Sequence, residues 1–353
     1  MPGPATIDHV VIRAADLDSG AAYVAGELGV DLPVGGRHAA MGTHNRVVSA
    51  GDAYLEVIAV DPEAATPDRA RWFGLDGDID QPRLGAWVIR VSDLSGITEL
   101  GEVIALERGD LSWRITVPAD GRVPLDGVGP MLIAWDDATP SPPEGGVRLV
   151  SLVVQHPDAE HLRQLLDRIG LAAPVSIQPA VTPGLAASFD TPRGPRTLSS
   201  DGVDLDITAE RQAAMDLFHL TWRYLDRDDR LPAEDAAMVA CAEASLWHWR
   251  RVGAPTQWSI GEWQCSRVHA VLGDGARALE HAQRALAIAE ADRVDDFVPA
   301  SAHEALSRAY AVLGDLDAAR AERNAAYRLA IELDDEDRDV IEHDLGTIPI
   351  PPG

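Results

Sequence analysis

The sequence predicts two structural classes in one chain: an α+β domain of repeated βαβββ modules, followed by an all-α domain of repeated helical hairpins. Three observations carry this prediction. Short β-branched segments with alternating apolar residues, separated by turn residues, run through the first 200 residues. One of these segments recurs about 77 residues later along the chain. From about Thr208, Ala-rich segments with apolar residues three or four apart extend nearly to the carboxyl terminus.

Composition limits the kind of protein that this chain forms. Its 353 residues are 46% hydrophobic and 25% charged, which provides a buried core and suggests two domains. The net charge is −27, and all 30 cationic residues are Arg. Nucleic acid is therefore excluded as a partner, because binding it requires clustered cations that displace counterions from phosphates. An anionic membrane surface is disfavoured for the same reason.

The sequence gives three indications of location. Only Cys241 and Cys265 are present, too few for a disulfide framework. The amino-terminal residues lack a cationic stretch followed by an apolar one, and no run approaches eighteen consecutive apolar residues. We therefore expect a cytoplasmic protein without membrane association.

The first module is predicted from its strand and cap signals. The expected strands are 7–13, 45–50 and 54–60. Between the first two, Asp16 or Asp18 caps a helix that reaches about Leu28 and that Gly29 ends. The order is βαβββ.

A second module begins at Leu84, because Leu84–Leu94 resembles Ile7–Leu17 in apolar pattern and in its closing Arg, Asp and Leu. Further strands are expected at 113–117 and 131–135. A third, weaker pass has strands at 147–155, 185–189 and 197–199 and a helix at 158–169 that Gly170 ends.

A linker at about 200–207 separates an expected domain at 5–200 from one at 208–349. The predicted helices are 209–226, 233–252, 257–272, 275–291, 298–312, 316–333 and 335–345. The sequence Ala-Val-Leu-Gly-Asp occurs at Ala270 and again at Ala311, each time before a helix, which gives a period of about 41 residues. A Gly-Asp turn between such helices resembles a tetratricopeptide-type (TPR) repeat, whose usual period is nearer 34. The second domain is thus predicted to be TPR-like.

The first domain resembles the vicinal oxygen chelate (VOC) superfamily, and in particular its glyoxalase-like domain proteins. The resemblance covers about residues 5 to 200. It rests on four segments: Asp8-His9-Val-Val, Gly35-Gly-Arg-His38, Gly42-Thr-His-Asn45 and Tyr54-Leu-Glu56. It implies that paired modules curl into a half-open cup that commonly holds a divalent metal, with ligands from both modules.

Strand alternation supports half of such a site. It places His9 with Ile7, Val11 and Arg13 on one face of the first strand. On the later strand, Tyr54, Glu56 and Ile58 share a face. An imidazole and a carboxylate on neighbouring strands can converge on one ion, so we predict His9 and Glu56 as metal ligands and as catalytic residues. The loop residues His38 or His44 would supply a third ligand. The metal would be Zn, Fe, Mn, Ni or Mg.

The second module lacks the matching ligands. Aligning the repeats places Ala86 opposite His9 and Ile133 opposite Glu56, and neither side chain binds a metal. Two protein ligands are fewer than the three of a typical catalytic site. An ordinary hydrogen-bonded pair of His9 and Glu56 inside a cup is therefore the alternative to a metal centre.

Several further residues are candidate ligand contacts in the first domain. Arg37 is a candidate for binding a carboxylate or phosphate, with a solvated guanidinium as the alternative. His38, His44, Asn45 and Tyr54 are candidates from the loop and strands, although the Gly-rich sequence around the two His residues also fits a backbone-shaping loop. The tryptophans Trp87, Trp113 and Trp135 recur on strands of the second module. Alternation makes Trp135 the pocket candidate and assigns Trp87 to the core.

The helical domain has a candidate site of its own. His219, Trp247, His248 and Trp263 lie beside the apolar stripes of their helices rather than on them. Such a group can line a ligand pocket or a peptide groove. Core packing with wide apolar faces is the alternative.

Three functions remain open at this stage. The first is a glyoxalase-like lyase or isomerase that acts on a small organic molecule, with metal assistance if the ion is present. The second is a non-catalytic protein that binds or sequesters a small molecule, as VOC resistance proteins do. The third is a ligand sensor or scaffold that docks a partner protein, or a second copy as a homodimer, through the TPR-like domain.

Overall fold

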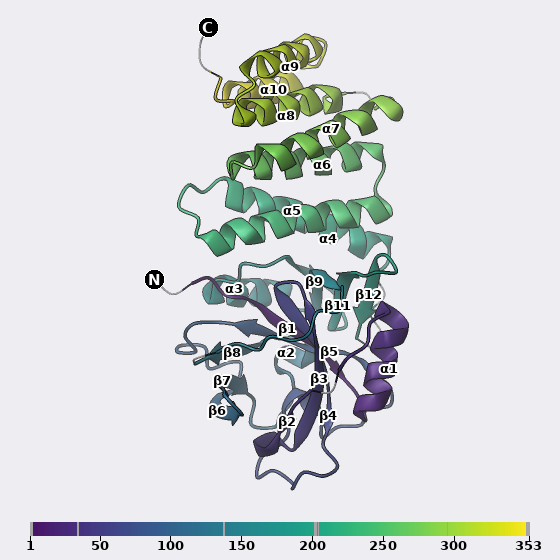
Figure 1. The fold of residues 1–353 in the computed structure, drawn as a ribbon, viewed down its shortest axis with the longest axis vertical. Helices are drawn as coiled ribbons and strands as arrows, with labels where there is room; N and C mark the ends of the chain where they lie inside the picture. The colour runs from purple at the N-terminus through teal and green to yellow at the C-terminus, as the bar shows by residue number, and fades with distance from the viewer. Residues whose placement is uncertain are drawn as a thin grey trace. The chain divides into compact units, whose positions relative to one another are not determined.

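The computed structural model describes residues 3–33, 35–136, 138–200, 203, 205–294 and 296–350. The chain divides into two compact units, Met1–Leu205 and Asp206–Gly353. The first contains all the described strands, and the second is helical (Figure 1). The predicted order of an α+β domain followed by an all-α region is confirmed.

The first module has the predicted βαβββ order, which is completed by a two-residue strand at 37–38 that was not itself predicted. Its elements are β1 (Thr6–Arg13), α1 (Leu17–Leu28), β2 (Arg37–His38), β3 (Thr43–Ala50) and β4 (Ala53–Val60). Helix α1 begins where the Asp16 side chain accepts a hydrogen bond from the backbone N–H of Ser19. It ends at Gly29, whose φ of 74° lies in the left-handed region that glycine adopts without strain.

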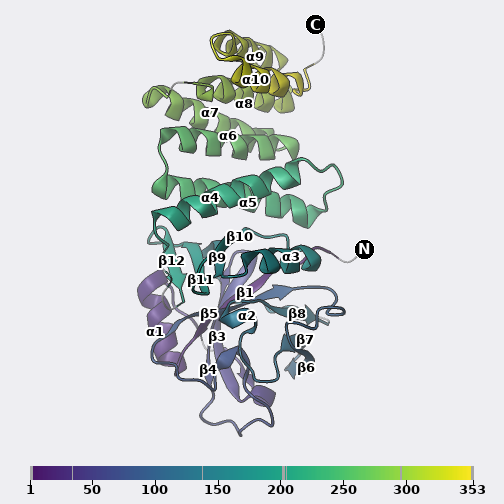
Figure 2. The same ribbon diagram turned by 180° about the vertical axis from the view of Figure 1, so that it is seen from behind.

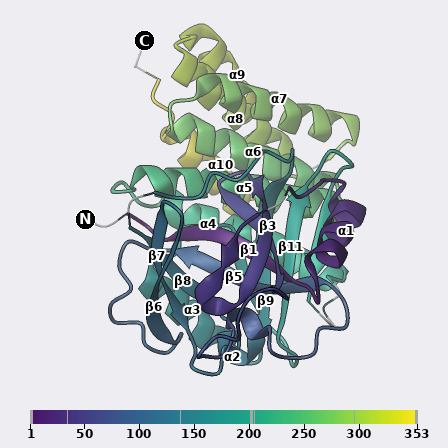
Figure 3. The same ribbon diagram turned by 60° about the horizontal axis from the view of Figure 1, so that its bottom comes forward.

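The second module extends the same sheet. It consists of β5 (Arg83–Arg90), β6 (Glu102–Arg108), β7 (Leu111–Val117) and β8 (Met131–Trp135). The eight strands lie in the order β2-β3-β4-β1-β5-β8-β7-β6. Strands β1 and β5 pair antiparallel at the centre, and each has a parallel neighbour on its other side, β4 and β8 respectively. The two modules are thus related by an approximate twofold axis that passes between β1 and β5. Figure 3 shows β6 and β7 together at one side of this unit.

The second module departs from the first in its connection. Residues 91–101, between β5 and β6, contain turns and bends where the first module has α1. Strand β6 was not predicted, because its residues Glu102, Glu107 and Arg108 give a polar, largely exposed edge strand.

The third segment has the expected strands and helix, but it also contains a strand at 175–179 that was not predicted, and its pairing differs from that of the modules. It comprises β9 (Arg148–His156), α3 (Ala159–Ile169), β10 (Val175–Pro179), β11 (Gly184–Asp190) and β12 (Arg196–Ser199), with α3 beside β9 and β10 in Figure 2. Its strand order is β10-β9-β11-β12, whereas the first module has its last strand next to its first. The first and second strands, β9 and β10, pair parallel across the helix. This segment is therefore a separate four-stranded sheet and not a third copy of the module.

Two hydrophobic cores lie on opposite sides of the eight-stranded sheet. One core contains Val10, Leu55 and Trp87 together with residues of α1, α3 and the four-stranded sheet. The other contains Val11, Ile58 and Trp113 and lies on the side of the predicted cup. Trp87 is fully buried in the first core, as the alternation predicted.

The second unit contains the seven predicted helices. They are α4 (Ile207–Leu225), α5 (Pro232–Val252), α6 (Pro255–Val271), α7 (Gly275–Ala291), α8 (Val298–Leu313), α9 (Leu316–Ala330) and α10 (Asp335–Gly346). In Figure 1, α4 to α9 follow one another as pairs in chain order, and α10 lies beside α8 and α9. In the parts of the chain that the structure describes, no helix has both the length and the apolar character needed to cross a bilayer.

The hairpins α6–α7 and α8–α9 repeat in structure as well as in sequence. The hydroxyl of Ser266 donates to the carbonyl oxygen of Ala278, and that of Ser307 donates to that of Ala319, at 2.8 Å in both hairpins. Asp274 and Asp315 cap α7 and α9 in the same way. The repeat of about 41 residues is confirmed. Its TPR-like nature and the docking of a partner or second copy on it stay predictions.

Candidate functional site

A bulge in β1 places two consecutive polar residues on the same side of the sheet. Pairing with β5 shifts register between Ile7 and His9, so Asp8 is the extra residue. The side chain of Ile7 consequently lies in the core behind the sheet, while Asp8 and His9 both turn toward the cup. The predicted face of Ile7, His9, Val11 and Arg13 is therefore wrong at Ile7, because strict alternation fails at a bulge.

His9 lies between two carboxylates. Its Nδ1 is 2.7 Å from Asp8 Oδ1, and its Nε2 is 3.4 Å from Glu56 Oε2. The other oxygen of Asp8 accepts hydrogen bonds from Arg90 Nε at 2.7 Å and Trp135 Nε1 at 2.9 Å. Tyr54 stacks on the imidazole, with ring centroids 4.5 Å apart. The ring of His9 is thus fixed from both edges and from one face.

The glycine-containing loop before β2 positions Glu56 through Asn45. The Asn45 amide donates to Glu56 Oε1 at 2.5 Å, and its own oxygen accepts from the backbone N–H of Gly36 at 2.8 Å. A Cβ at Gly35 would lie 2.1 Å from the Asn45 carbonyl oxygen, so only glycine permits this approach. The backbone-shaping interpretation of the loop is therefore supported, and Asn45 contributes both to the loop and to the site.

His38 and Arg108 close the opposite wall. Arg108 Nη1 donates to His38 Nε2 at 2.9 Å, and His38 Nδ1 lies 3.2 Å from Thr43 Oγ1. His38 ends β2 and Arg108 ends β6, which are the two edge strands of the sheet. The sheet therefore curls until its edges meet through side chains.

These residues surround a small hollow that we call the cup cavity. It is lined by His9, His38, Asn45, Tyr54, Glu56, Trp72, Phe73, Arg108, Trp113, Ile115, Ile133 and Trp135. Its volume is about 30 Å³, which leaves room for about two water molecules. The aromatic residues make the walls apolar around a buried ionic pair.

Burial and charge set the protonation states in the cup cavity. Burial alone would lower the pKa of His9, but its hydrogen bonds to Asp8 and Glu56, and the charges of these carboxylates, raise it to about 9. For Glu56, the His9 and Asn45 contacts outweigh burial, which would raise the pKa, and lower it below the usual value. Burial lowers the pKa of His38 to about 4 and raises that of Tyr54 well above 10. At neutral pH, His9 is a cation, Glu56 an anion and His38 neutral.

The donor set does not fit the divalent metal that the VOC resemblance implies. Both ring nitrogens of His9 face carboxylates, and a protonated imidazole has no lone pair for a metal. Ala86 and Ile133, at the matching positions of the second module, are buried and provide no donor. Throughout the described residues, no three His, Cys, Asp or Glu side chains are grouped so that they could hold an ion. His9 and Arg90 instead balance the charges of the two carboxylates, Asp8 and Glu56.

Two predicted contacts of the first unit lie outside the cup cavity. The exposed Arg37 side chain forms ion pairs with the exposed Glu63 at 2.6 Å and with the buried Asp61 at 3.5 Å. His44 alternates along β3 with Thr43 and Asn45, and its side chain is not part of the cavity wall. In contrast, His38, Asn45, Tyr54 and Trp135 line the cavity together with His9 and Glu56.

The predicted residues of the helical unit fall into separate groups. Fully buried His248 bonds to Glu210, and Trp247 contacts His248 and Arg251. The indole N–H of Trp263 donates to Glu304 at 2.8 Å, and its ring contacts Trp222 and Arg267. His219 is exposed, and its ring contacts Phe218. The His248 bond joins α5 to α4 and the Trp263 bond joins α6 to α8, whereas the contacts of Trp247 and His219 lie within one helix.

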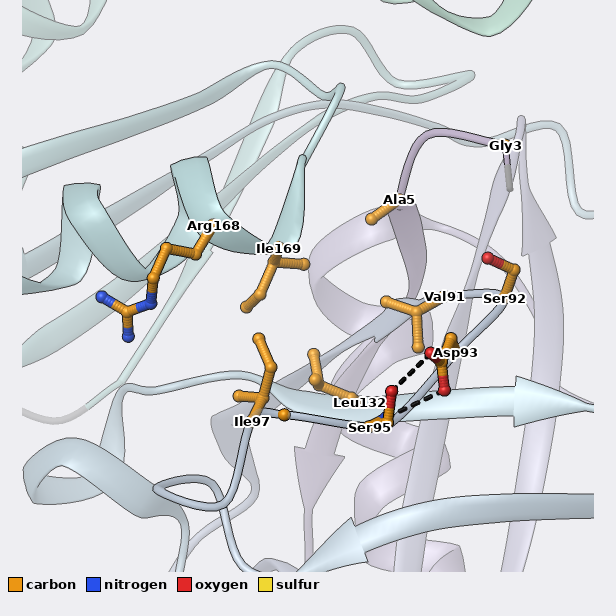
Figure 4. Close-up of a pocket in the computed structure, with 11 residues that line it drawn as sticks. Gly3, Ala5, Val91, Ser92, Asp93, Ser95, Ile97, Leu132, Arg168 and Ile169 are labelled. Atoms are coloured by element: carbon orange, nitrogen blue, oxygen red, sulfur yellow. Dashed lines mark hydrogen bonds between the residues drawn. The ribbon is translucent and has the colours of Figure 1, made fainter. Parts of the chain in front are cut away.

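A second hollow of about 330 Å³ lies where the second module has a loop instead of a helix. Figure 4 shows Arg168 and Ile169 on one side and Val91, Ser92 and Asp93 on the other. Its charged groups already have partners: Asp93 accepts from Ser95, and Arg168 pairs with Glu99. The cup cavity, where opposite charges are buried together, is therefore the better candidate site.

Sequence reasoning missed two important residues. Asp8 was part of the quoted motif but was assigned no role, because the bulge that turns it toward His9 depends on pairing with β5. Arg108 lies on the unpredicted strand β6. A weak signal was present, because Ile104, Leu106 and Arg108 alternate and the first two pack against the cup-side core.

Comparison with known proteins agrees with this description. Residues 7–170 match the family described as glyoxalase-like domain, in agreement with the VOC-type fold of the N-terminal unit. No curated protein matches the chain.

Three solved structures are similar to part of the chain. A hypothetical protein from Staphylococcus aureus is 15% identical with a TM-score of 0.33, over 47% of this chain and 74% of that one. Methylmalonyl-CoA epimerase from Mycobacterium tuberculosis is 20% identical with a TM-score of 0.27, over 38% and 88%. A methylmalonyl-CoA epimerase in complex with methylmalonyl-CoA and NH4+ is 17% identical with a TM-score of 0.28, over 40% and 100%.

Proposed function

We propose that the N-terminal unit binds a small carbonyl compound in the cup cavity and moves a proton on it, as in an isomerase or lyase step. The observation that carries this proposal is the buried pair of Glu56 and His9, 3.4 Å apart, facing one cavity. A carboxylate and an imidazolium held together in an apolar enclosure are suited to general acid–base work.

The two residues have different roles in the proposed step. Glu56 is ionised and accepts the proton from the carbon next to the carbonyl group. The electron pair of that C–H bond moves to the carbonyl oxygen, which becomes an enolate. The His9 imidazolium donates a hydrogen bond from Nε2 to this oxygen and stabilises its charge. Return of the proton from Glu56 to the opposite face of that carbon completes an isomerisation. In a lyase reaction, the enolate electron pair forms a C=C bond as a group leaves the next carbon, and this leaving group takes the proton from Glu56.

Surrounding residues hold this pair in position. Asn45 fixes one oxygen of Glu56 at 2.5 Å, and Asp8 holds His9 from the far side at 2.7 Å. Trp72, Trp113 and Trp135 line the cavity and help to limit its volume to about 30 Å³. Because the cavity is smaller than a carbonyl compound, we expect its walls to move when the ligand enters.

Deuterium exchange tests the proposed proton transfer. Pyruvate and acetone are carbon acids whose methyl protons exchange with D2O, and NMR measures the rate. We expect the protein to accelerate exchange of at least one of them, and Glu56→Gln to reduce the acceleration by about 100-fold or more. Glu63→Gln is the matched control, because Glu63 is an exposed carboxylate outside the cavity. Equal acceleration by the Glu56→Gln variant and the wild type, or none by the wild type, would rule the proposal out.

Binding without turnover is the second candidate function. It is favoured by one observation: the second module supplies Ala86 and Ile133 where the first supplies His9 and Glu56, so half of the cup carries no reactive group. Saturable binding of pyruvate or acetone in the same NMR samples, with exchange no faster than in buffer, would support sequestration over catalysis.

A further inference from the structure

We propose that the ligand of the cup carries a carboxylate, or an oxyanion of similar size, and that Arg108 binds it. This inference rests on the proposed function for the place where the ligand binds, and it adds the chemical class of that ligand.

Arg108 lines the cup cavity without a carboxylate partner among the described residues. Its hydrogen bonds there use Nη1 alone, to His38 Nε2 at 2.9 Å and to Asn45 Oδ1 at 3.5 Å. Both acceptors are neutral. The Nε and Nη2 hydrogens therefore have no protein acceptor within the described residues.

Other arginines on the eight-stranded sheet differ from Arg108. Arg90 pairs with Asp8 at 2.7 Å, Arg37 pairs with Glu63 at 2.6 Å, and Arg46 pairs with Asp18 at 2.6 Å. The chain has 57 acidic residues against 30 arginines, so carboxylates are abundant. A guanidinium that faces a cavity without one is therefore a distinctive feature of this site.

The chemistry of guanidinium selects the ligand. Its planar fork matches the two oxygens of a carboxylate, and the hydrogen bonds are stronger when both partners are charged. The apolar cavity wall strengthens the attraction further, because water competes less. Glu56 is itself anionic, so an anionic group of the ligand is directed away from Glu56 and toward Arg108.

The position of Arg108 also orients the ligand relative to the reactive pair. His9 and Glu56 lie on adjacent β1 and β4, whereas Arg108 lies on the edge strand β6. A ligand with its carboxylate on Arg108 presents its other end to Glu56 and His9. In the proposed function, that end carries the carbonyl group and the acidic C–H bond.

Binding of acetate tests the recognition without requiring catalysis. Acetamide has the same shape without the charge, and saturation-transfer NMR measures both. We expect Arg108→Gln to raise the Kd for acetate at least tenfold and to leave acetamide binding unchanged. Arg37→Gln is the matched control, because it removes the same charge from an exposed arginine nearby, and we expect its Kd for acetate to stay within twofold of the wild type.

A second variant distinguishes a loss of acetate recognition from a folding defect. Arg108→Lys keeps the charge but loses the fork, and we expect acetate affinity between those of the wild type and Arg108→Gln. Equal acetate affinity in Arg108→Gln and Arg37→Gln, or no saturable acetate binding by the wild type, would overturn the inference. So would an equal loss of acetate and acetamide binding in Arg108→Gln.

The outcomes separate this inference from the proposed function. Glu56→Gln removes the general base, but it also removes a negative charge, so we expect acetate to bind at least as tightly. Acetate binding that depends on Arg108, without deuterium exchange on pyruvate, would leave the inference standing and the proposed proton transfer rejected. Deuterium exchange that needs Glu56 but proceeds equally in Arg108→Gln would leave the proposed proton transfer standing and reject this inference.

Discussion

Arg108 Nη1 donates a hydrogen bond to His38 Nε2 at 2.9 Å, and this contact joins the two edge strands of the eight-stranded sheet. A guanidinium only donates, so Nε2 of His38 must carry a lone pair. The proton of the neutral ring is then on Nδ1, which faces Thr43 Oγ1 at 3.2 Å. The closure of the cup therefore requires that His38 stays uncharged.

The first prediction concerns the stability of the protein at acidic pH. Burial lowers the folded-state pKa of His38 from 6.5 to about 4, so the unfolded chain binds a proton in a range where the folded protein does not. Stability is therefore lost as the pH falls from about 6.5 to 4, by about 3 kcal/mol from this residue. Urea unfolding over this pH range measures the slope. We expect His38→Asn to flatten it, and an unchanged slope would contradict the assignment.

The second prediction concerns Asp8, the bulge residue. Replacing Asp8 by Asn removes the charge that holds His9 and Arg90, so we expect a loss of about 3 kcal/mol in the free energy of unfolding. Asp18 pairs with Arg46 but its side chain is 89% exposed, so Asp18→Asn should have a small effect. Chemical denaturation at pH 7 compares the two variants. Equal losses would show that the buried network contributes no more than a surface pair.

The third prediction concerns the divalent metal content of the purified protein. Because both nitrogens of His9 face carboxylates, we expect purified protein to contain far less than one divalent ion per chain. Treatment with a chelator should leave the unfolding temperature unchanged. Elemental analysis and thermal unfolding are the measurements. One equivalent of metal in the wild type, absent from His9→Asn, would show that the donor set rearranges around an ion.

The fourth prediction concerns Gly36. A Cβ at this position would lie 2.5 Å from Arg108 Nη1, so Gly36→Ala forces the guanidinium to move. The obstacle is a flexible side chain, and we expect a small change in unfolding temperature together with weaker acetate binding. Gly26→Ala is the control, because nothing lies within 4 Å of the Cβ that it would add. Unchanged acetate affinity in Gly36→Ala would indicate that the position of Arg108 is not limiting.

The fifth prediction uses the helical repeat. Glu262 and His281 form an ion pair at 2.6 Å in one hairpin, and His303 and Glu322 form the reversed pair at 2.6 Å in the next. Glu262 is 1% exposed and also binds Arg250 and Arg284, whereas the second pair is partly exposed. We expect the exchange His303→Glu with Glu322→His to cost less than about 1 kcal/mol.

The same exchange in the first hairpin should behave differently. Glu262→His with His281→Glu places an imidazole against two guanidinium groups, and we expect a loss of about 3 kcal/mol. Denaturation of the full chain compares the two double variants. Similar losses in both hairpins would contradict the distinct role given to Glu262.

Local signals in the sequence were sufficient for most elements. Asp16 and Gly29 delimit α1 because a cap and a left-handed glycine act within one turn of the helix. The helices of the second unit were predicted from the apolar spacing of each segment. Strand β6 was missed because an exposed edge strand needs little apolar patterning.

The candidate site was predicted in part. His9, Glu56, Asn45, Tyr54, His38 and Trp135 meet in one cavity, while Arg37 and His44 do not reach it. Arg37 was a reasonable candidate by residue type, yet its nearby carboxylates Asp61 and Glu63 bind it outside the cavity. Which arginine faces the cavity depends on how the edges of the sheet meet.

The amino-acid sequence by itself determined the two classes of structure, the repeat of the modules, and the strands that carry His9 and Glu56. These features follow from local periodicity and from turn and cap residues that act over a few positions. Only the tertiary structure decided that Asp8 turns toward His9, that Arg108 reaches His38, and that the third segment forms its own sheet. Strand register and the meeting of distant edges depend on pairing between segments far apart in the chain, which no local pattern specifies.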